Sequence, residues 1–121
     1  MSEQLYTGRC QCGAVAIEVL VDLEKTRTCN CSRCQRLGAV WGYTTLDRLK
    51  ILQGEEQLTT FTFNRHRGQH KFCKICGIEP FAVGSIAVVN ANCLDNIDPR
   101  ALTPLRGFEP LGEQSVPAAI H

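Results

Sequence analysis

The hydrophobic residues of this chain recur mostly at every second position, which is the spacing of half-buried β-strands. The clearest run covers residues 14–21, and its inward face would carry Val15, Ile17, Val19 and Val21. Leu58 to Asn64 repeats the pattern and places Phe61 and Phe63 together on a face that we expect to belong to the core. Further short strands are expected over Leu5–Cys10, Val40–Thr45, Leu49–Leu52, Gln69–Phe72 and Ile86–Ala91.

Helical patterns are scarce. Single turns are expected at Ser32–Leu37 and Leu46–Leu49, and Asp98 to Leu102 offers an N-cap aspartate followed by a proline at the first helical position. The prediction is a mainly β domain over residues 1–102 with one or two short helical turns. From Thr103 onward three prolines and two glycines predict an irregular C-terminal strap over residues 103–121, in which Leu105, Phe108 and Leu111 are expected to hold the first half against the body.

Composition supports one folded domain and excludes several classes of protein. The 121 residues are 44% hydrophobic, and 13 basic against 12 acidic residues give a formal net charge of +1. This balance lacks the basic footprint of a nucleic-acid-binding protein. No segment approaches the roughly 18 apolar residues of a membrane span, and Met1 to Leu5 lack the charged start of an export signal. We therefore expect a cytoplasmic protein.

Seven of the eight cysteines fall into three tight clusters, which is the main chemical signal in the chain. The clusters are Cys10-Gln11-Cys12, Cys29-Asn30-Cys31-Ser32-Arg33-Cys34 and Cys73-Lys74-Ile75-Cys76. A disulfide framework is the alternative, but a reducing cytoplasm and the strain of a Cys-x-Cys bridge argue against it. Metal binding, with four thiolates around one zinc and three around another, is the preferred interpretation.

Sulfurs that share one tetrahedral zinc must lie closer together than residues i and i+2 on a flat strand, so each cluster must turn. Gly13 follows Cys12 and Gly77 follows Cys76, and glycine tolerates the positive φ of such a turn. If the first and last pairs join, their ion is closed and structural. Three thiolates from one short turn leave a fourth position open for substrate.

Five segments resemble the glutathione-dependent formaldehyde-activating enzyme family, which includes centromere protein V relatives. They are Gly8-Arg9-Cys10-Gln11-Cys12-Gly13, Cys29 to Cys34, His70-Lys71-Phe72-Cys73-Lys74-Ile75-Cys76-Gly77, Ile78-Glu79-Pro80-Phe81 and Val89-Asn90-Ala91-Asn92-Cys93-Leu94-Asp95. Many relatives carry Asp-Gly and an aromatic residue where this chain has Arg106-Gly107-Phe108.

This resemblance implies a zinc-stapled, tent-like β fold with two zinc ions. It implies a structural site at Cys10, Cys12, Cys73 and Cys76 and a catalytic site at Cys29, Cys31 and Cys34. The implied activity is that of a carbon–sulfur lyase that joins glutathione, or a similar small thiol, to formaldehyde. The chain could also form a homodimer.

Several residues outside the clusters are candidates for this chemistry. His70 could shuttle a proton or be structural, and Cys93 could reach the open zinc, act as a redox thiol or simply be buried. Asn90 and Asn92 could donate to substrate or cap turns. Candidate partners for substrate carboxylates are Arg33, Arg36, Arg65, Arg67 and Lys71. Trp41 and Tyr43 are expected to pack in the core.

Two rival functions fit part of the sequence. One is a non-catalytic zinc module that binds a protein partner, with Cys93 closing the second site. The other is a methionine-R-sulfoxide reductase with Cys93 as nucleophile. The second rival lacks the arginine and aromatic residue usually placed before that nucleophile, and it leaves Cys29, Cys31 and Cys34 without a role.

Overall fold

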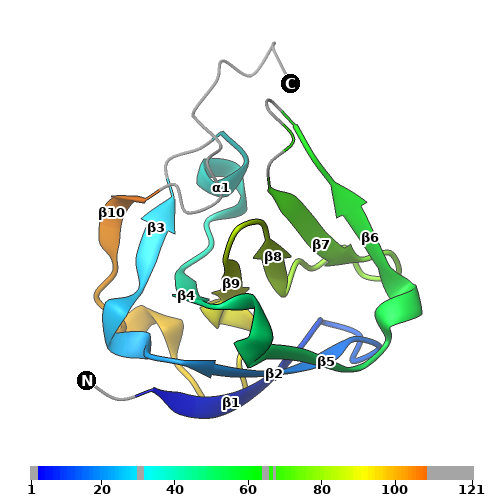
Figure 1. The fold of residues 1–121 in the computed structure, drawn as a ribbon, viewed down its shortest axis with the longest axis horizontal. Coiled ribbons are helices and arrows are strands. Elements are labelled where there is room, and N and C mark those ends of the chain that lie inside the picture. The colour runs from blue at the N-terminus through cyan, green and yellow to red at the C-terminus, as the bar shows by residue number, and fades with distance from the viewer. Residues whose placement is uncertain (1–2, 30–31, 64–65, 67, 109–121) are drawn as a thin grey trace.

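The computed structural model describes residues 3–29, 32–63, 66 and 68–108. The described chain is mainly β, as the hydrophobic pattern predicted, and its strands form two sheets (Figure 1). The strands are β1 (Gln4–Arg9), β2 (Ala16–Val21), β3 (Arg27–Cys29), β4 (Trp41–Thr44), β5 (Leu49–Gln53), β6 (Leu58–Phe61), β7 (Gln69–Cys73), β8 (Phe81–Val83), β9 (Ala87–Asn90) and β10 (Leu105–Phe108).

Helical structure is confined to short turns. The one α-helix of the described chain, α1, covers Ser32–Leu37, where the sequence predicted it. Single 3₁₀ turns occupy Leu23–Lys25, Leu46–Arg48, Glu55–Gln57, Ala91–Cys93 and Pro99–Ala101. The Asp98 side chain accepts a hydrogen bond from the Arg100 N–H at 3.0 Å, which confirms the predicted N-cap. No helix in the described part of the chain is long and apolar enough to cross a membrane.

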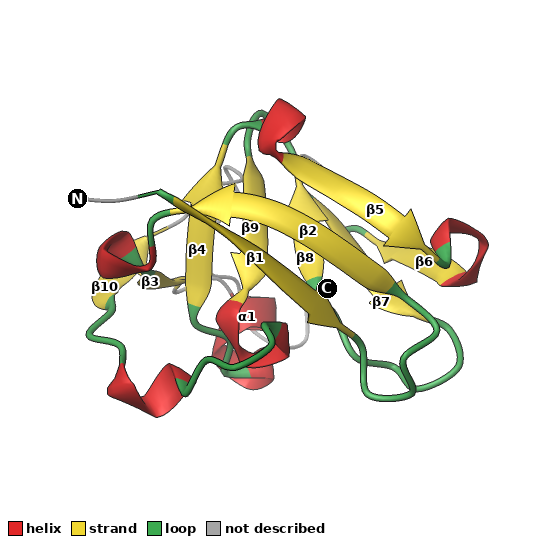
Figure 2. Cartoon of the chain, turned by 90° about the horizontal axis from the view of Figure 1, so that it is seen from below, coloured by secondary structure: helices red, strands yellow, loops and turns green. Residues whose placement is uncertain are grey.

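The two sheets differ in size and lie across one another. The smaller sheet has the order β1-β2-β5, and the larger has the order β10-β3-β4-β9-β8-β7-β6. All pairs are antiparallel except β10 and β3, which run parallel. The small sheet forms the base in Figure 1, while strands of the large sheet rise from it toward α1, and Figure 2 shows β1, β2 and β5 crossing the large sheet from below.

The main core lies between the two sheets and confirms the alternating pattern of the second strand. Every inward residue of residues 14–21 is completely buried, namely Val15, Ile17, Val19 and Val21. They pack in one cluster with Phe81 and Val89 of the large sheet and with Cys10 and Cys73. Two cysteines of the predicted structural site therefore belong to the core that joins the sheets.

A second core cluster covers the opposite face of the large sheet, close to α1. It contains Cys29, Cys34, Ala39, Trp41, Phe63, Ala82 and Val88. Trp41 is 1% exposed and Phe63 is 2% exposed, as expected of core residues. The prediction for Phe61 was wrong, because β6 is an edge strand and leaves this ring 36% exposed.

Three strands were missed by the hydrophobic pattern. β3 and β8 are three residues long, too short to show an alternation. β10 corrects the prediction of an irregular strap from Thr103, since Leu105–Phe108 pairs with β3 despite the neighbouring prolines and glycines. A segment can pair through its backbone with the edge strand of a sheet without alternating hydrophobic residues, and for this reason the sequence pattern did not predict β10. Leu111 lies outside the described residues.

Candidate functional site

Two cysteine knuckles are built into strand connections of different sheets. In the β1–β2 connection the N–H of Gly13 donates to the Cys10 carbonyl at 3.2 Å, and the N–H of Cys10 donates to Val15 at 3.1 Å. In the β7–β8 connection the N–H of Gly77 donates to the Cys73 carbonyl at 2.8 Å. Gly13 and Gly77 have φ values of 80° and 81°, which confirms the positive φ predicted after each knuckle.

The knuckles bring the sulfurs of Cys10, Cys12, Cys73 and Cys76 within 4.8 Å of one another. The Sγ atoms of Cys10 and Cys12 are 3.6 Å apart, and those of Cys12 and Cys73 are 3.7 Å apart. A tetrahedral ion with metal–sulfur bonds of ~2.3 Å requires sulfurs separated by about 3.8 Å. The four thiols therefore fit a metal ion of the predicted kind, and the seven described cysteines form no disulfide.

The thiols of this four-cysteine centre do not ionise equally. Burial opposes ionisation of Cys76, but the N–H groups of Ile78 and Cys12 and two neighbouring thiols donate to it and lower its pKa to about 6. Cys12 receives a hydrogen bond from Ala14, yet burial and its bonds to the other thiols raise its pKa to about 11. Four thiolates in one place repel one another, so a cation would favour the fully ionised set.

The middle cysteine cluster is described only in part. Cys31 lies outside the described residues. Cys29 ends β3 and Cys34 lies in α1, and both are buried in the second core cluster at 8% and 6% exposure. The helix and the strand that carry them thus meet on one face of the large sheet. The assignment of a second ion to Cys29, Cys31 and Cys34 stays a prediction.

The same face of the large sheet carries His70. Residues opposite one another on neighbouring strands share a face, and the strand register runs from Phe61 to His70, from His70 to Ala82 and from Ala82 to Val88. Ala82 and Val88 pack in the cluster that contains Cys29 and Cys34. His70 therefore belongs to the face of the middle cysteine cluster, although in the sequence only Lys71 and Phe72 separate it from Cys73 of the second knuckle.

His70 is part of a buried chain of three charged or titratable side chains, which we call the Arg33–Glu79–His70 chain. The Arg33 guanidinium donates to Oε1 of Glu79 from Nε at 3.1 Å and from Nη2 at 2.8 Å. Oε2 of Glu79 lies 2.7 Å from Nδ1 of His70. The side chains of Glu79 and His70 are 0% and 2% exposed. The Arg33–Glu79–His70 chain thereby links α1 to β7 of the large sheet.

The hydrogen bonds assign a proton within this chain. Two N–H groups of Arg33 donate to Oε1, which identifies Glu79 as a carboxylate that accepts hydrogen bonds. His70 therefore donates from Nδ1, and in the neutral ring Nε2 keeps its lone pair. This Nε2 atom is buried and finds no hydrogen-bond partner in the described part of the chain. A lone pair on this atom is able to accept a hydrogen bond or a proton.

Sequence reasoning did not single out Glu79. The available signal was a lone acidic residue between Ile78 and Pro80, directly after a cysteine knuckle and next to apolar residues. An isolated carboxylate in such a run is rarely buried without a partner. The pattern could not name Arg33 as that partner, because 46 residues separate the two in the chain.

Cys93 and Asn90 both donate to the backbone carbonyl of Glu79, at 3.8 Å and 3.0 Å. Burial, followed by the negative charges of Cys10, Cys76 and Glu79, raises the pKa of the Cys93 thiol to about 12. A neutral thiol is a poor nucleophile, which weighs against the reductase interpretation, and the catalytic assignment of Cys93 stays a prediction. Asn90 accepts from the Asn92 N–H at 3.0 Å and donates to the Glu79 carbonyl at 3.0 Å, so its role is structural.

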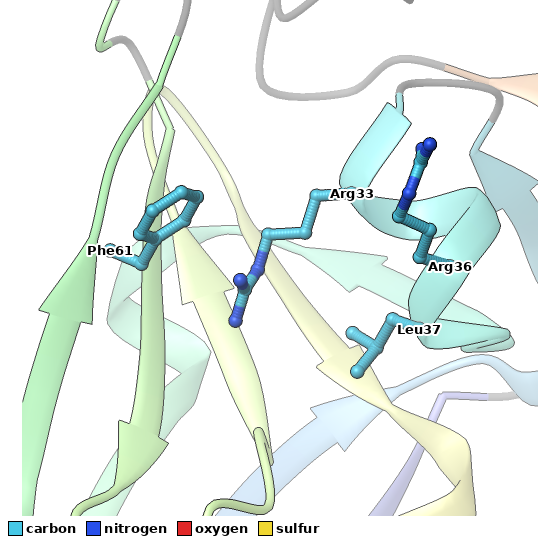
Figure 3. Close-up of a pocket in the computed structure, with 4 residues that line it drawn as sticks. All are labelled: Arg33, Arg36, Leu37 and Phe61. Carbon is cyan, nitrogen blue, oxygen red and sulfur yellow. The ribbon is translucent and has the colours of Figure 1, made fainter. Parts of the chain in front are cut away.

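A small pocket opens between α1 and the edge of the large sheet, and we call it the α1 pocket (Figure 3). Its volume is about 270 Å³, and it is lined by Arg33, Arg36, Leu37 and Phe61. Two of the predicted carboxylate-binding residues are thus brought together. Lys71 instead donates to Thr60 at 2.8 Å, while Arg65 and Arg67 lie outside the described residues.

These features define a small two-sheet β protein with a cluster of four cysteines that could hold a metal ion and a separate polar face beside a second cysteine cluster. The family model described as glutathione-dependent formaldehyde-activating enzyme matches residues 5–108, which is most of the chain. The chain belongs to this family. It is also similar to a protein of Rhodobacter sphaeroides whose crystal structure is known, with 33% identity, a TM-score of 0.78 and coverage of 84% of this chain and 99% of that one.

Proposed function

We propose that this protein is a zinc-dependent carbon–sulfur lyase that reversibly joins a glutathione-like thiol to a small aldehyde such as formaldehyde. Membership of the formaldehyde-activating family supports both substrates. We assign one zinc ion to Cys10, Cys12, Cys73 and Cys76, where the sulfur spacing fits a tetrahedral ion. We assign a second zinc to Cys29, Cys31 and Cys34, and we place the protein in the cytoplasm, where thiols stay reduced.

The observation that carries this proposal is the position of the Arg33–Glu79–His70 chain. It lies on the sheet face that also carries Cys29 and Cys34, and a buried carboxylate paired with a buried imidazole is a frequent feature of functional sites. When bound, zinc supplies a lowered pKa for a coordinated thiol, which is then a thiolate at neutral pH. The face therefore combines a predicted thiol site with a proton-carrying group.

The reaction requires one proton to change place. In the direction of synthesis, the new carbon–sulfur bond forms as the carbonyl double bond opens to a single bond. The proton that the thiol loses ends on the former carbonyl oxygen. We assign His70 to hold this proton at Nε2 between the two steps, because Nδ1 is already engaged by Glu79. Glu79 orients the ring and balances its charge when both nitrogens are protonated.

The test measures catalysis at equilibrium, because thiols and formaldehyde also react without a catalyst. Exchange NMR on a mixture of glutathione, formaldehyde and their adduct gives the interconversion rate directly. The zinc-loaded protein is expected to raise this rate well above that of buffer, and Cys34→Ser is expected to return it to the buffer value. Arg100→Gln, at an exposed position on the Pro99–Ala101 turn, is the matched control and should behave as the unaltered protein.

An exchange rate equal to that of buffer, measured with fully metallated and folded protein, would contradict the proposal. That result would favour the rival function, a non-catalytic zinc module that binds a protein partner. A full rate in Cys34→Ser would instead place the chemistry away from the middle cysteine cluster.

A further inference from the structure

A larger cleft lies between the two sheets, and we call it the inter-sheet cleft. Its volume is about 770 Å³, and its described walls come from β5 and the turns on either side of it and from β6, β7 and β8 of the large sheet. In Figure 1, β5 belongs to the base, and β6 and β7 rise from one end of it. In the described chain β5 and β6 are each the last strand of their sheet, so the cleft lies beside the outer strands of both sheets.

The inter-sheet cleft faces away from the middle cysteine cluster. Lys71 lies opposite Phe81 and Gln69 lies opposite Val83 in the β7–β8 ladder, so these four side chains share one face of the large sheet. Phe81 belongs to the main core between the sheets. His70 alternates with Lys71 along β7 and therefore lies on the opposite face. The large sheet thus separates the inter-sheet cleft from the middle cysteine cluster.

The wall of the cleft is mainly apolar. Its apolar residues are Leu46, Leu49, Ile51, Leu58, Phe81 and Val83. Leu49, Ile51, Leu58 and Val83 pack on the margin of the main core and stay partly exposed, and Leu46 is 49% exposed. Covering such surface with hydrocarbon is favourable. Pockets of roughly 300–1,000 Å³ with mainly apolar walls are typical of small-molecule sites.

Lys71 provides a cation beside this apolar wall. Its side chain is half-buried, and its Nζ atom donates to Oγ1 of Thr60 at 2.8 Å. An ammonium group carries three N–H donors, so Lys71 can bind an anion and keep its hydrogen bond to Thr60. Next to an apolar wall, where water is partly excluded, a charge-assisted hydrogen bond is stronger than in open solvent.

The other polar residues of the cleft are more exposed. They are Lys50, Glu55 and Gln69. Lys50 lies opposite Glu18 in the β2–β5 ladder, on the face of the small sheet that points away from the main core. The exposed charge of Glu55 is screened by water and salt. The cation that a ligand meets beside the apolar wall is therefore Lys71.

We infer that the inter-sheet cleft binds a medium-chain fatty acid, with the hydrocarbon chain along the apolar wall and the carboxylate on Lys71. A half-buried cation next to an apolar wall matches a ligand with one acidic group and a hydrocarbon body. This inference goes beyond the proposed reaction, because the cleft and the middle cysteine cluster lie on opposite faces of the large sheet. The cleft is a second site, distinct from that of the thiol and the aldehyde.

The test titrates the zinc-loaded protein with hexanoate, octanoate and decanoate below the concentrations at which they form micelles. Calorimetry should show an affinity that rises roughly fourfold for each added methylene group, because each one buries further apolar surface. In nitrogen-15 NMR spectra, the backbone amide signals of Leu49, Ile51 and Val83 should shift on titration, and those of α1 should not.

Substitution of Lys71 tests the carboxylate contact. Lys71→Gln should weaken decanoate binding roughly tenfold or more, as for loss of a hydrogen bond to a charged group, and should leave the binding of decanol unchanged. Lys71→Arg keeps the positive charge and should retain most of the affinity for decanoate. Lys25→Gln, at an exposed position on the Leu23–Lys25 turn, is the matched control and should bind decanoate as the unaltered protein does.

Four results would overturn the inference. Three are equal binding of decanoate and decanol to the unaltered protein, unchanged binding of decanoate to folded Lys71→Gln, and an affinity that does not rise from hexanoate to decanoate. The fourth is a dimer, detected by sedimentation, that protects the amides of Leu49 and Val83 and that decanoate does not dissociate, which would assign the apolar wall to a second copy of the chain. None of these measurements depends on exchange of glutathione with formaldehyde, so the inference can fail while the proposed reaction stands.

Discussion

The four-cysteine centre and the face of Cys29 and Cys34 use the same kind of side chain in two different ways. At the four-cysteine centre, backbone turns fix the sulfurs, and the knuckles belong to connections in different sheets. At the other face, the cysteines lie beside a buried chain of Arg33, Glu79 and His70 and a small pocket. A site whose sulfurs are fixed by backbone turns can hold the two sheets together, whereas a site surrounded by polar side chains can act on a ligand.

This difference also explains how the two regions are connected. Glu79 follows the second knuckle by three residues and reaches Arg33 on α1. The connection that carries Cys73 and Cys76 thus also positions the helix that carries Cys34. Any test of one region should include a measurement on the other.

The largest expected effect is loss of the four-cysteine centre. Removal of metal by a chelator, or Cys73→Ser, should unfold the protein, because a structural zinc contributes roughly 10–16 kcal/mol and a whole domain is stable by only about 5–15 kcal/mol. Circular dichroism and metal analysis of the same sample would measure this. Cys93→Ser is the control and should keep the fold. A melting curve that is unchanged after complete loss of metal would show that the four-cysteine centre does not stabilise the fold.

A substitution in the middle cluster should separate function from folding. Cys31→Ser is expected to lower the metal content by one equivalent and to abolish the acceleration of glutathione–formaldehyde exchange, while the fold is retained. The reason is that the main core and the four-cysteine centre lie in other segments of the chain. Metal analysis and thermal melting of the variant would measure both effects. Unfolding of Cys31→Ser, or full metal content, would contradict the division between the two regions.

The Arg33–Glu79–His70 chain should contribute both stability and activity. Glu79→Gln leaves Arg33 without its carboxylate partner inside the protein, and breaking a buried ion pair from one side costs about 3–5 kcal/mol. Urea denaturation should show a lower midpoint with an unchanged slope. Glu56→Gln, at an exposed position, is the control and should change stability by less than about 0.5 kcal/mol.

The same variant also tests the proton assignment at His70. Nitrogen-15 chemical shifts of the ring should report a proton at Nδ1 in the unaltered protein and a mixture of tautomers in Glu79→Gln, since the accepting carboxylate is lost. A purely structural role for Glu79 would lower stability and leave the exchange rate of the folded fraction unchanged.

The smallest effect is expected at an exposed ion pair of the same chemical type. Arg9 and Asp95 are joined at 3.1 Å, with side chains 59% and 28% exposed, and such pairs contribute about 0–1 kcal/mol. Hydrogen bonds from Arg9 and Thr7 lower the pKa of Asp95. Its contribution is therefore present above the ordinary carboxyl pKa of ~3.9 and is lost as pH falls through the lower value of the folded protein.

Comparison of Asp95→Asn with the unaltered protein by urea denaturation at pH 7 and at pH 3 or below would measure this contribution. The two proteins should differ slightly at pH 7 and converge in acid. A difference larger than that of Glu79→Gln would reverse the ranking of buried and exposed pairs.

The sequence by itself predicted the elements whose signal is local. The alternation from Val15 to Val21, the turn at Ser32–Leu37 and the cap at Asp98 all depend on residues a few positions apart, and each was confirmed. The same holds for the positive φ of Gly13 and Gly77, because a knuckle must turn within its own residues. The spacing left the pairing of the first and last cysteine clusters open, and the family resemblance implied it; the structure brings the four sulfurs together.

Only the tertiary structure decided which distant side chains meet. Nothing in the local pattern relates Arg33 to Glu79 or to Phe61, because these contacts arise where an edge strand and a short helix approach one sheet face. β10 likewise exists because β3 offers an edge for pairing, not because Leu105–Phe108 alternates in hydrophobicity. Local chemistry determines strands, turns and knuckles, whereas burial of a charge depends on the partner that the fold brings to it.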